Sequence, residues 1–146
     1  MAHTRRDAVY VAPWDASAPA EPLTTPNDGQ TNNTQPAWSP DQTRIVFRTN
    51  RSDPSRNVAD IWVMDSPFGS LPGEPSARPL VVRAGDERYP TFSPDGAQLL
   101  FRGDEDGIAP SEDEEIYVAR ADGSNIVALT DDDALDSAPA WSPDGS

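Results

Sequence analysis

The feature that most constrains the fold is a short motif that occurs three times. It reads Pro-Ala-Trp-Ser-Pro-Asp at residues 36–41, Pro-Thr-Phe-Ser-Pro-Asp-Gly at 90–96 and Pro-Ala-Trp-Ser-Pro-Asp-Gly at 139–145. The first and second copies are 54 positions apart, and the second and third are 49 apart. A period of about fifty residues predicts stacked supersecondary units of similar size rather than one irregular core.

Short segments rich in β-branched and aromatic residues follow each copy of the motif, and such segments are typical of strands. A full unit contains four of them, which we expect to pair as four antiparallel strands. The expected strands are 36–39, 44–48, 60–64 and 79–82 in one unit and 90–93, 98–102, 115–119 and 126–129 in the next. Four short strands per repeat are typical of a β-propeller blade, so the expected fold is all-β.

The repeat divides the whole chain. Residues 7–34 correspond to the third and fourth strands of a first blade, and residues 35–85 and 86–134 to two complete blades. Residues 135–146 correspond to the first strand of a further blade. We therefore expect a propeller segment with two complete blades plus parts of two flanking blades. The favoured interpretation is a piece of a longer protein, and the alternative is that copies of the chain complete a propeller head to tail.

The Ser-Pro-Asp-Gly sequence has a mechanical role between the first and second strands. Proline presets φ at the second turn position, Ser and Asp side chains bond nearby backbone amides, and Gly takes the conformation that closes the turn. The first copy has Gln42 where the others have glycine, and a positive φ there would cost about 1 kcal/mol. We interpret the motif as scaffold. Its residues are Trp38, Ser39, Pro40, Asp41, Phe92, Ser93, Pro94, Asp95, Gly96, Trp141, Ser142, Pro143, Asp144 and Gly145.

Large aromatic residues also recur once per unit, and we expect them to pack between blades. They are Trp38, Trp62, Phe92, Tyr117 and Trp141. Trp14 and Phe68 differ, because both lie in proline-containing loops outside the strand pattern. As a hypothesis these two are exposed anchors for a partner, with packing inside their own loops as the alternative.

Composition excludes several kinds of chemistry. The net charge is −14, with 25 acidic against 11 basic residues, whereas nucleic acid binding needs a basic face. Cysteine is absent, and the only histidine, His3, precedes the first expected strand, so thiol chemistry is excluded and a Ser-His-Asp triad is not expected. The sequence has no Gly-x-Ser-x-Gly segment and no apolar run of about 20 residues. We expect no enzyme, no cofactor and no membrane insertion.

Acidic residues gather in loops that blade topology places at one rim. The loop between strands 98–102 and 115–119 carries the partner-binding candidates Asp104, Glu105, Asp106, Glu112, Asp113 and Glu114. The connection after strand 126–129 carries Asp131, Asp132, Asp133 and Asp136, which are weak candidates for calcium. Crowded like charges are stabilised by solvent, a cation or a basic partner, and all three interpretations stay open.

The three Trp/Phe-Ser-Pro-Asp copies, the strands 60–64 and 115–119 that begin with an acid, and the closing Leu-Thr pairs resemble the repeat of TolB-type, WD-like β-propellers. This resemblance implies blades of four strands in a protein that acts as a binding platform, so we expect a non-catalytic scaffold for protein or peptide. An alternative that it permits is the propeller of a prolyl-oligopeptidase-type serine peptidase with catalysis outside this chain. The resemblance implies a periplasmic or extracellular parent, and the absence of a signal sequence leaves a cytoplasmic location open.

Overall fold

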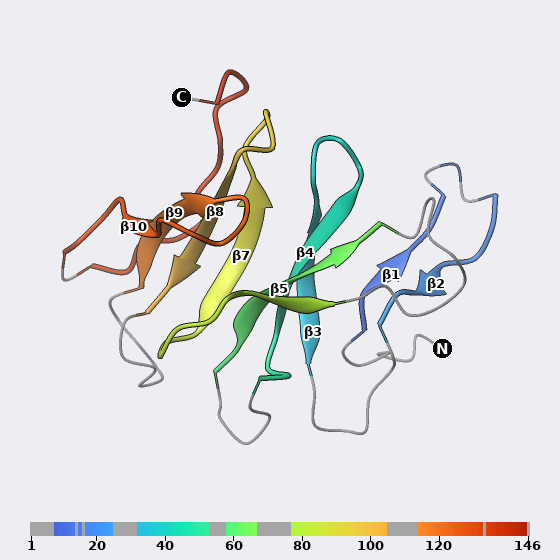
Figure 1. The fold of residues 1–146 in the computed structure, drawn as a ribbon, viewed down its shortest axis with the longest axis horizontal. Helices are drawn as coiled ribbons and strands as arrows, with labels where there is room; N and C mark the ends of the chain where they lie inside the picture. Colours follow the sequence, from blue (N-terminus) through green and yellow to red (C-terminus); the bar gives the residue numbers. More distant parts are fainter. Residues whose placement is uncertain are drawn as a thin grey trace.

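A computed structural model describes residues 8–13, 15, 17–24, 32–52, 58–66, 77–104, 114–132 and 134–145. These residues form ten strands in three antiparallel sheets that lie in a row (Figure 1). They include no helix that is long and apolar enough to cross a lipid bilayer. The all-β fold of four-stranded antiparallel sheets confirms the expected class.

Each strand pairs with the next one along the chain. The two-stranded sheet contains β1 (Tyr10–Val11) and β2 (Glu21–Pro22). The middle sheet contains β3 (Asn33–Trp38), β4 (Arg44–Thr49), β5 (Asp60–Asp65) and β6 (Arg78–Val81), in that order. The third sheet contains β7 (Glu87–Phe92), β8 (Gln98–Gly103), β9 (Glu115–Arg120) and β10 (Val127–Ala128), also in chain order. Sequential pairing in each complete sheet is the topology of a propeller blade.

The first strand of each complete sheet begins three residues earlier than the sequence predicts, because a bulge carries the strand through its proline. Gln35 and Tyr89, which precede the prolines, have φ of 52° and 53°. The pairing register shifts at the same places, in β3 and in β7. The Gln35 side-chain oxygen Oε1 accepts a hydrogen bond of 2.8 Å from the Tyr89 backbone N–H. The two bulges are therefore joined across neighbouring sheets.

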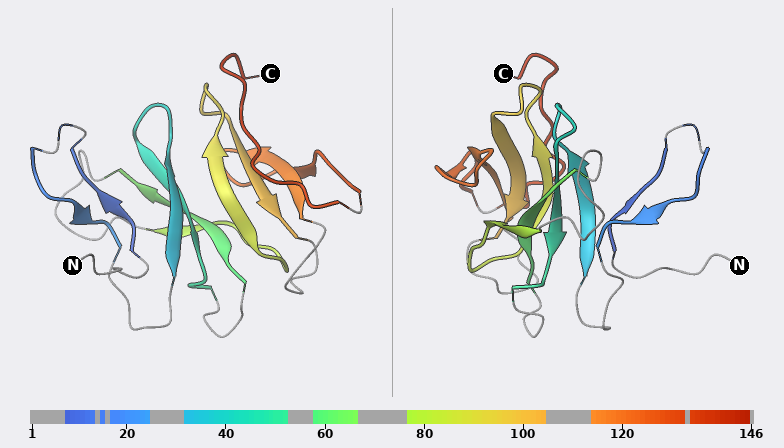
Figure 2. Two further views of the ribbon diagram at one scale, coloured as in Figure 1. Left: turned by 180° about the vertical axis from the view of Figure 1, so that it is seen from behind. Right: turned by 45° about the vertical axis from the view of Figure 1, so that its right-hand side comes forward.

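The Ser-Pro-Asp turns have the predicted construction. Ser39 Oγ donates to Asp41 Oδ1 at 2.6 Å and accepts from the Arg44 backbone N–H at 2.9 Å. The hydrogen bonds from Ser39 and then from Thr43 lower the pKa of Asp41 to about 2. Equivalent serine-to-aspartate bonds of 2.6 Å occur in the second and third copies. All three turns lie at the same end of the molecule, here named the turn end (Figures 1 and 2).

Gln42 has a φ of 61°, in the left-handed region where Gly96 (71°) and Gly145 (80°) lie. We expect Gln42→Gly to stabilise the protein by about 1 kcal/mol, because glycine takes a positive φ without the steric cost of a Cβ. Gln42 is exposed, so the change removes no buried contact. Urea denaturation of both proteins measures the difference in unfolding free energy.

The matched control for this substitution is the reverse exchange, Gly96→Gln. A Cβ at Gly96 would approach no atom closer than the Pro40 ring at 3.5 Å, so backbone strain is the main cost. We expect a destabilisation of similar size. A parent and a Gln42→Gly variant of equal stability would contradict the strain at Gln42.

Apolar side chains join the three sheets through two cores. The core between the middle and third sheets contains Val46, Ile61, Val63, Val81, Phe92, Leu99, Phe101, Tyr117 and Ala119. The core between the two-stranded and middle sheets contains Val9, Leu23, Ile45, Phe47 and Met64. Each four-stranded sheet thus turns one face to the sheet before it, as blades in a propeller do.

The repeated aromatic residues differ in their burial. Phe92 and Tyr117 are buried between the middle and third sheets, as expected, and Tyr117 stacks on Phe101 with ring centres 5.4 Å apart. Trp38, the counterpart of Phe92, is 39% exposed, so it is not buried between blades as expected. Trp38 pairs across the strands with Ile45 and therefore faces the two-stranded sheet. The described part of the sheet on that side is small, since β1 and β2 contain two residues each.

Residues 135–146 were expected to supply the first strand of a further blade, and the described part of this range, 135–145, forms no strand. Their contacts are nevertheless those of a repeat. Trp141 Nε1 donates to the Thr91 carbonyl oxygen at 3.3 Å. Gly145 lies beside Pro94 as Gly96 lies beside Pro40. The third turn therefore stacks on the second as the second stacks on the first.

Candidate functional site

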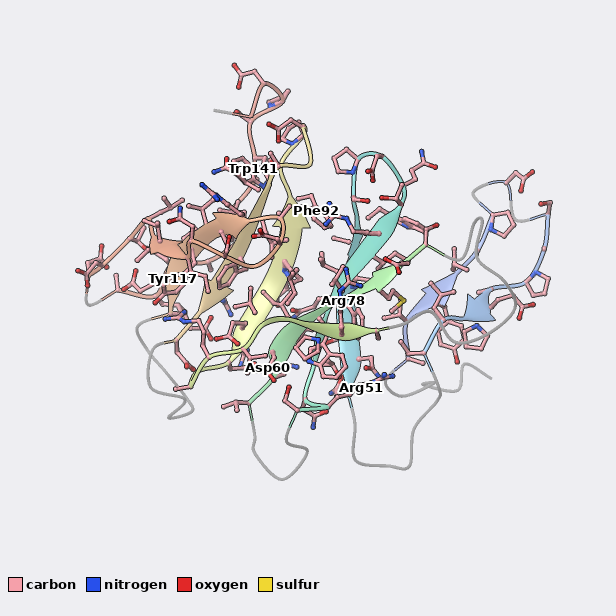
Figure 3. The ribbon with its side chains drawn as sticks, viewed as in Figure 1. Arg51, Asp60, Arg78, Phe92, Tyr117 and Trp141 are labelled. Atoms are coloured by element: carbon pink, nitrogen blue, oxygen red, sulfur yellow. The ribbon has the colours of Figure 1, made fainter. Side chains whose placement is uncertain are left out.

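A cluster of charged side chains lies between the middle and third sheets, at the end opposite the Ser-Pro-Asp turns. This loop end is where β4 and β8 finish and where β5, β7 and β9 begin. Figure 3 shows Asp60 at the loop end and Phe92 and Trp141 nearer the turn end. The acidic rim that the sequence predicts lies at the same end, so the contacts in this cluster show which of its acids are paired within the molecule.

Asp86, between β6 and β7, is the centre of the cluster and is only 2% exposed. Its carboxylate accepts from Arg48 Nε at 3.1 Å and Arg48 Nη2 at 2.8 and 2.9 Å. It also accepts from Arg88 Nε at 2.9 Å and Nη2 at 2.6 Å, and from the Ala59 backbone N–H at 3.1 Å. Because these donors come from both complete sheets, the Asp86 carboxylate joins the sheets to each other.

Two further charges extend this network within the third sheet. Glu114, which is 5% exposed, pairs with Arg102 on β8 and lies 3.7 Å from Arg88 Nε. Arg102 occupies the position in β8 that Arg48 occupies in β4. In each complete sheet, the arginine at this position therefore pairs with an acid that is buried at the loop end.

A hydrogen bond that the sequence did not predict closes the loop end of each complete sheet. Asn50, just after β4, accepts from the Asn32 backbone N–H at 2.7 Å. Asp104, just after β8, accepts from the Asp86 backbone N–H at 3.0 Å. The 54-residue spacing of Asn50 and Asp104 could have indicated this repeated bond. Because one residue is an amide and the other an acid, they do not form a recognisable sequence motif. The bond ties the start of the first strand to the end of the second.

These contacts change the interpretation of two partner-binding candidates. Asp104 and Glu114 are 3% and 5% exposed and bond within the molecule, so they do not project from a solvated rim. The other candidates, Glu105, Asp106, Glu112, Asp113, Trp14 and Phe68, lie outside the described residues.

The acids after β10 remain at the surface. Asp131 and Asp132 are exposed, Asp136 is half-buried and Asp133 lies outside the described residues. The Asp132 carboxylate accepts from the Ala134 backbone N–H at 2.8 Å, which fixes a local turn. Within the described residues, no group of three or more histidine, cysteine, aspartate or glutamate side chains is arranged to hold a metal ion.

The closing Leu-Thr pair has a structural role beside these acids. Thr130 Oγ1 accepts from the Ile116 backbone N–H at 3.0 Å and donates to the Glu115 carboxylate. Thr24 accepts from the Val9 backbone N–H at the same distance in the two-stranded sheet. The threonine therefore fixes the outer strand to the one before it, and the acid that begins β9 is held by this contact.

Glu87 at the start of β7 is different, because neither of its carboxyl oxygens has a hydrogen-bond partner although the residue is fully buried. Burial, followed by the nearby carboxylate of Asp60, raises the pKa of Glu87 to about 8. A carboxyl group with such a pKa is neutral over much of the ordinary pH range.

Comparison with known proteins gives similarity to TolB proteins. The Tol-Pal system protein TolB of Anaeromyxobacter dehalogenans (strain 2CP-C) is 36% identical over 106 residues, which are 73% of this chain and 21% of that protein. No protein-family model matches the chain. The chain thus spans about a fifth of this curated relative.

Two solved structures have the same architecture. The putative TolB from Agrobacterium tumefaciens superposes with a TM-score of 0.72 at 26% identity, covering 94% of this chain and 47% of that one. TolB from Acinetobacter baumannii superposes with a TM-score of 0.62 at 22% identity, covering 97% of this chain and 31% of that one. The second likeness concerns the fold alone.

Proposed function

We propose that this chain, which has the TolB-like β-propeller fold, is a non-catalytic scaffold that binds a protein or peptide through the acidic surface at its loop end. The observation that carries the proposal is that the repeated residues have structural roles. The motif serines and aspartates form turns, the aromatic residues of the third sheet fill a core, and the paired arginines hold buried acids. Binding is therefore assigned to residues that differ between repeats.

The charge of the chain indicates the chemistry of the partner. The net charge is −14, and Asp131 and Asp132 are exposed beside the loop end of the third sheet. A basic segment of a protein would neutralise these carboxylates, and complementary charge speeds association and selects the partner. The proposed partner surface is thus basic.

The test is binding of an arginine-rich peptide, measured by calorimetry at low and high salt. We expect the double variant Asp131→Asn/Asp132→Asn to weaken binding about two- to thirtyfold, since each of the two exposed charge pairs contributes about 0.2–1 kcal/mol. Asparagine at position 132 still accepts the Ala134 hydrogen bond, so the local turn is kept. Affinity should also fall as salt screens the charges.

The control variant is Glu21→Gln/Asp65→Asn, which removes the same number of charges from exposed residues away from the loop end. Glu21 begins β2 and Asp65 ends β5, so both lie toward the turn end. Equal loss of affinity in the two double variants would show that net charge rather than a site binds the peptide. Turnover of a substrate by the purified chain would contradict the non-catalytic assignment.

A further inference from the structure

The interface between the middle and third sheets contains a carboxyl group that the ion-pair network leaves out. The Glu87 backbone is fixed there, because its N–H donates to the Ala59 carbonyl oxygen at 2.8 Å across the two sheets. Its side chain is fully buried, and both carboxyl oxygens are without hydrogen bonds. The group therefore cannot move to solvent without disturbing the contact between the sheets.

Charged groups from each packed element face Glu87. Acids come from the start of β5 (Asp60), from the connection before β7 (Asp86) and from the position just after β8 (Asp104). Arg83, between β6 and β7, supplies a positive charge, but its buried Nη1 also lacks a hydrogen bond. The Arg83 guanidinium instead lies over the Tyr117 ring, 4.1 Å from its centre. Desolvation and three neighbouring acids thus oppose ionisation of the Glu87 carboxyl group.

The equivalent position of the preceding repeat shows what the site accommodates. Asn33 occupies it, is 2% exposed, and accepts hydrogen bonds from Thr49 Oγ1 at 2.9 Å and Arg51 Nε at 3.1 Å. The oxygen of a neutral amide thus accepts two hydrogen bonds at this point of the fold. In the third sheet, Gly103 stands where Thr49 stands in the middle sheet, so the hydroxyl donor is missing.

We propose that Glu87 makes the joint between the middle and third sheets sensitive to pH, packing tightly while the carboxyl group is protonated and loosening when it ionises. The raised pKa of Glu87 determines whether the stability of the fold rises or falls with pH. Below the unfolded pKa of about 4.5 both states are protonated, and Glu87 causes no pH dependence. Between 4.5 and about 8 the unfolded chain is ionised while the folded chain holds the proton, so stability falls as pH rises.

The first experiment compares urea unfolding of the parent and of Glu87→Gln from pH 5 to pH 9. We expect the unfolding constant of the parent to rise, relative to that of the variant, about tenfold per pH unit until pH 8 and then to level off. Both proteins contain His3 and the other titratable groups, so the contributions of those groups cancel when the two pH profiles are subtracted. Parallel pH profiles, or a variant less stable than the parent at pH 8, would overturn the proposal, because Glu87 would then be ionised and paired with Arg83.

The second experiment is independent of whether the variant folds. Carbon-13 NMR of the Glu87 carboxyl carbon in the parent should give a titration midpoint near 8. A midpoint near the ordinary glutamate value would overturn the proposal. Amide hydrogen exchange at Glu87 should accelerate above this midpoint, because its N–H bonds across the joint.

A third variant restores the missing donor. A Cβ at Gly103 would lie 3.7 Å from Glu87 Cγ and 3.5 Å from Arg83 Nη1, which are ordinary contacts, so Gly103→Ser fits the space. We expect the serine hydroxyl to bond the carboxylate, lower the NMR midpoint and reduce the pH dependence of unfolding. An unchanged midpoint in a folded Gly103→Ser protein would contradict the explanation from the missing hydroxyl.

Discussion

Asp86→Ala is expected to destabilise the protein by about 3 kcal/mol, because it leaves two arginines without the buried acid that pairs with them. Asp86 is 2% exposed and accepts five hydrogen bonds from Arg48 and Arg88 together, so water does not replace its carboxylate. It also accepts from the Ala59 backbone N–H, which the substitution leaves unpaired. Urea denaturation at neutral pH measures the loss of unfolding free energy.

An exposed ion pair is the matched control for Asp86. Asp65 lies 3.7 Å from Arg78, and both side chains are about half exposed. Exposed pairs contribute about 0–1 kcal/mol, so Asp65→Ala should have an effect several times smaller. Similar losses from the two substitutions would contradict the role of Asp86 as the bond between sheets. A loss confined to amide protection at Ala59 and Glu87 would show local opening of the joint.

Phe101→Ala is expected to cost about 3 to 5 kcal/mol, the usual range for a large aromatic residue truncated in a core. Phe101 is fully buried on β8 and stacks on Tyr117, and its core contains residues of the middle and third sheets. The cavity would therefore open between the two sheets. Urea denaturation measures the loss of unfolding free energy. Amide exchange of Val46 and Ile61 on the facing sheet measures the local opening at the cavity.

Leu129→Ala is the control for this truncation. Leu129 is 58% exposed, so removing its side chain should change stability by no more than about 0.5 kcal/mol. If Phe101→Ala were as mild as Leu129→Ala, the sheets would not depend on their shared core. The interpretation of the two sheets as blades packed face to face would then be wrong.

Several features of this fold could be predicted because they depend on residues close together in the chain. A Ser-Pro-Asp-Gly sequence forms the same turn wherever it occurs, and Ser39, Ser93 and Ser142 all bond the aspartate two residues later. The positive φ at Gln42 followed from its place in this turn. Strand order followed from the short connections, since strands that are close in sequence pair with each other.

The start of the first strands was predicted late for a local reason that composition does not reveal. A proline cannot donate to a neighbouring strand, so the sequence favours a strand that begins at Pro36 or Pro90. The residue before each proline instead takes a positive φ and forms a bulge, which lets pairing continue on both sides. The bulge is stabilised across the sheets by the Gln35 to Tyr89 bond, which no local pattern indicates.

The candidate site was predicted less completely. The sequence gathered acids at one end of the blades, and Asp131 and Asp132 are exposed there. It did not separate these from Asp104 and Glu114, which are buried. The exposed and the buried acids are of the same residue types and lie at similar places in the loops. They differ only in which arginines and backbone amides the neighbouring strands bring within reach.

The sequence by itself determined the repeat, its four-stranded unit and its turns, because those depend on spacing and on the conformations that proline, glycine and aspartate allow. Only the tertiary structure decided which charges are paired. Asp86 meets Arg48, 38 residues earlier in the chain, because the two consecutive four-stranded sheets pack face to face. Glu87 has no hydrogen bond to its carboxyl group, and its partner across the strands, Gly103, offers no hydroxyl. Coulomb energy and desolvation depend on distance and burial in three dimensions, and neither is encoded in any short stretch of residues.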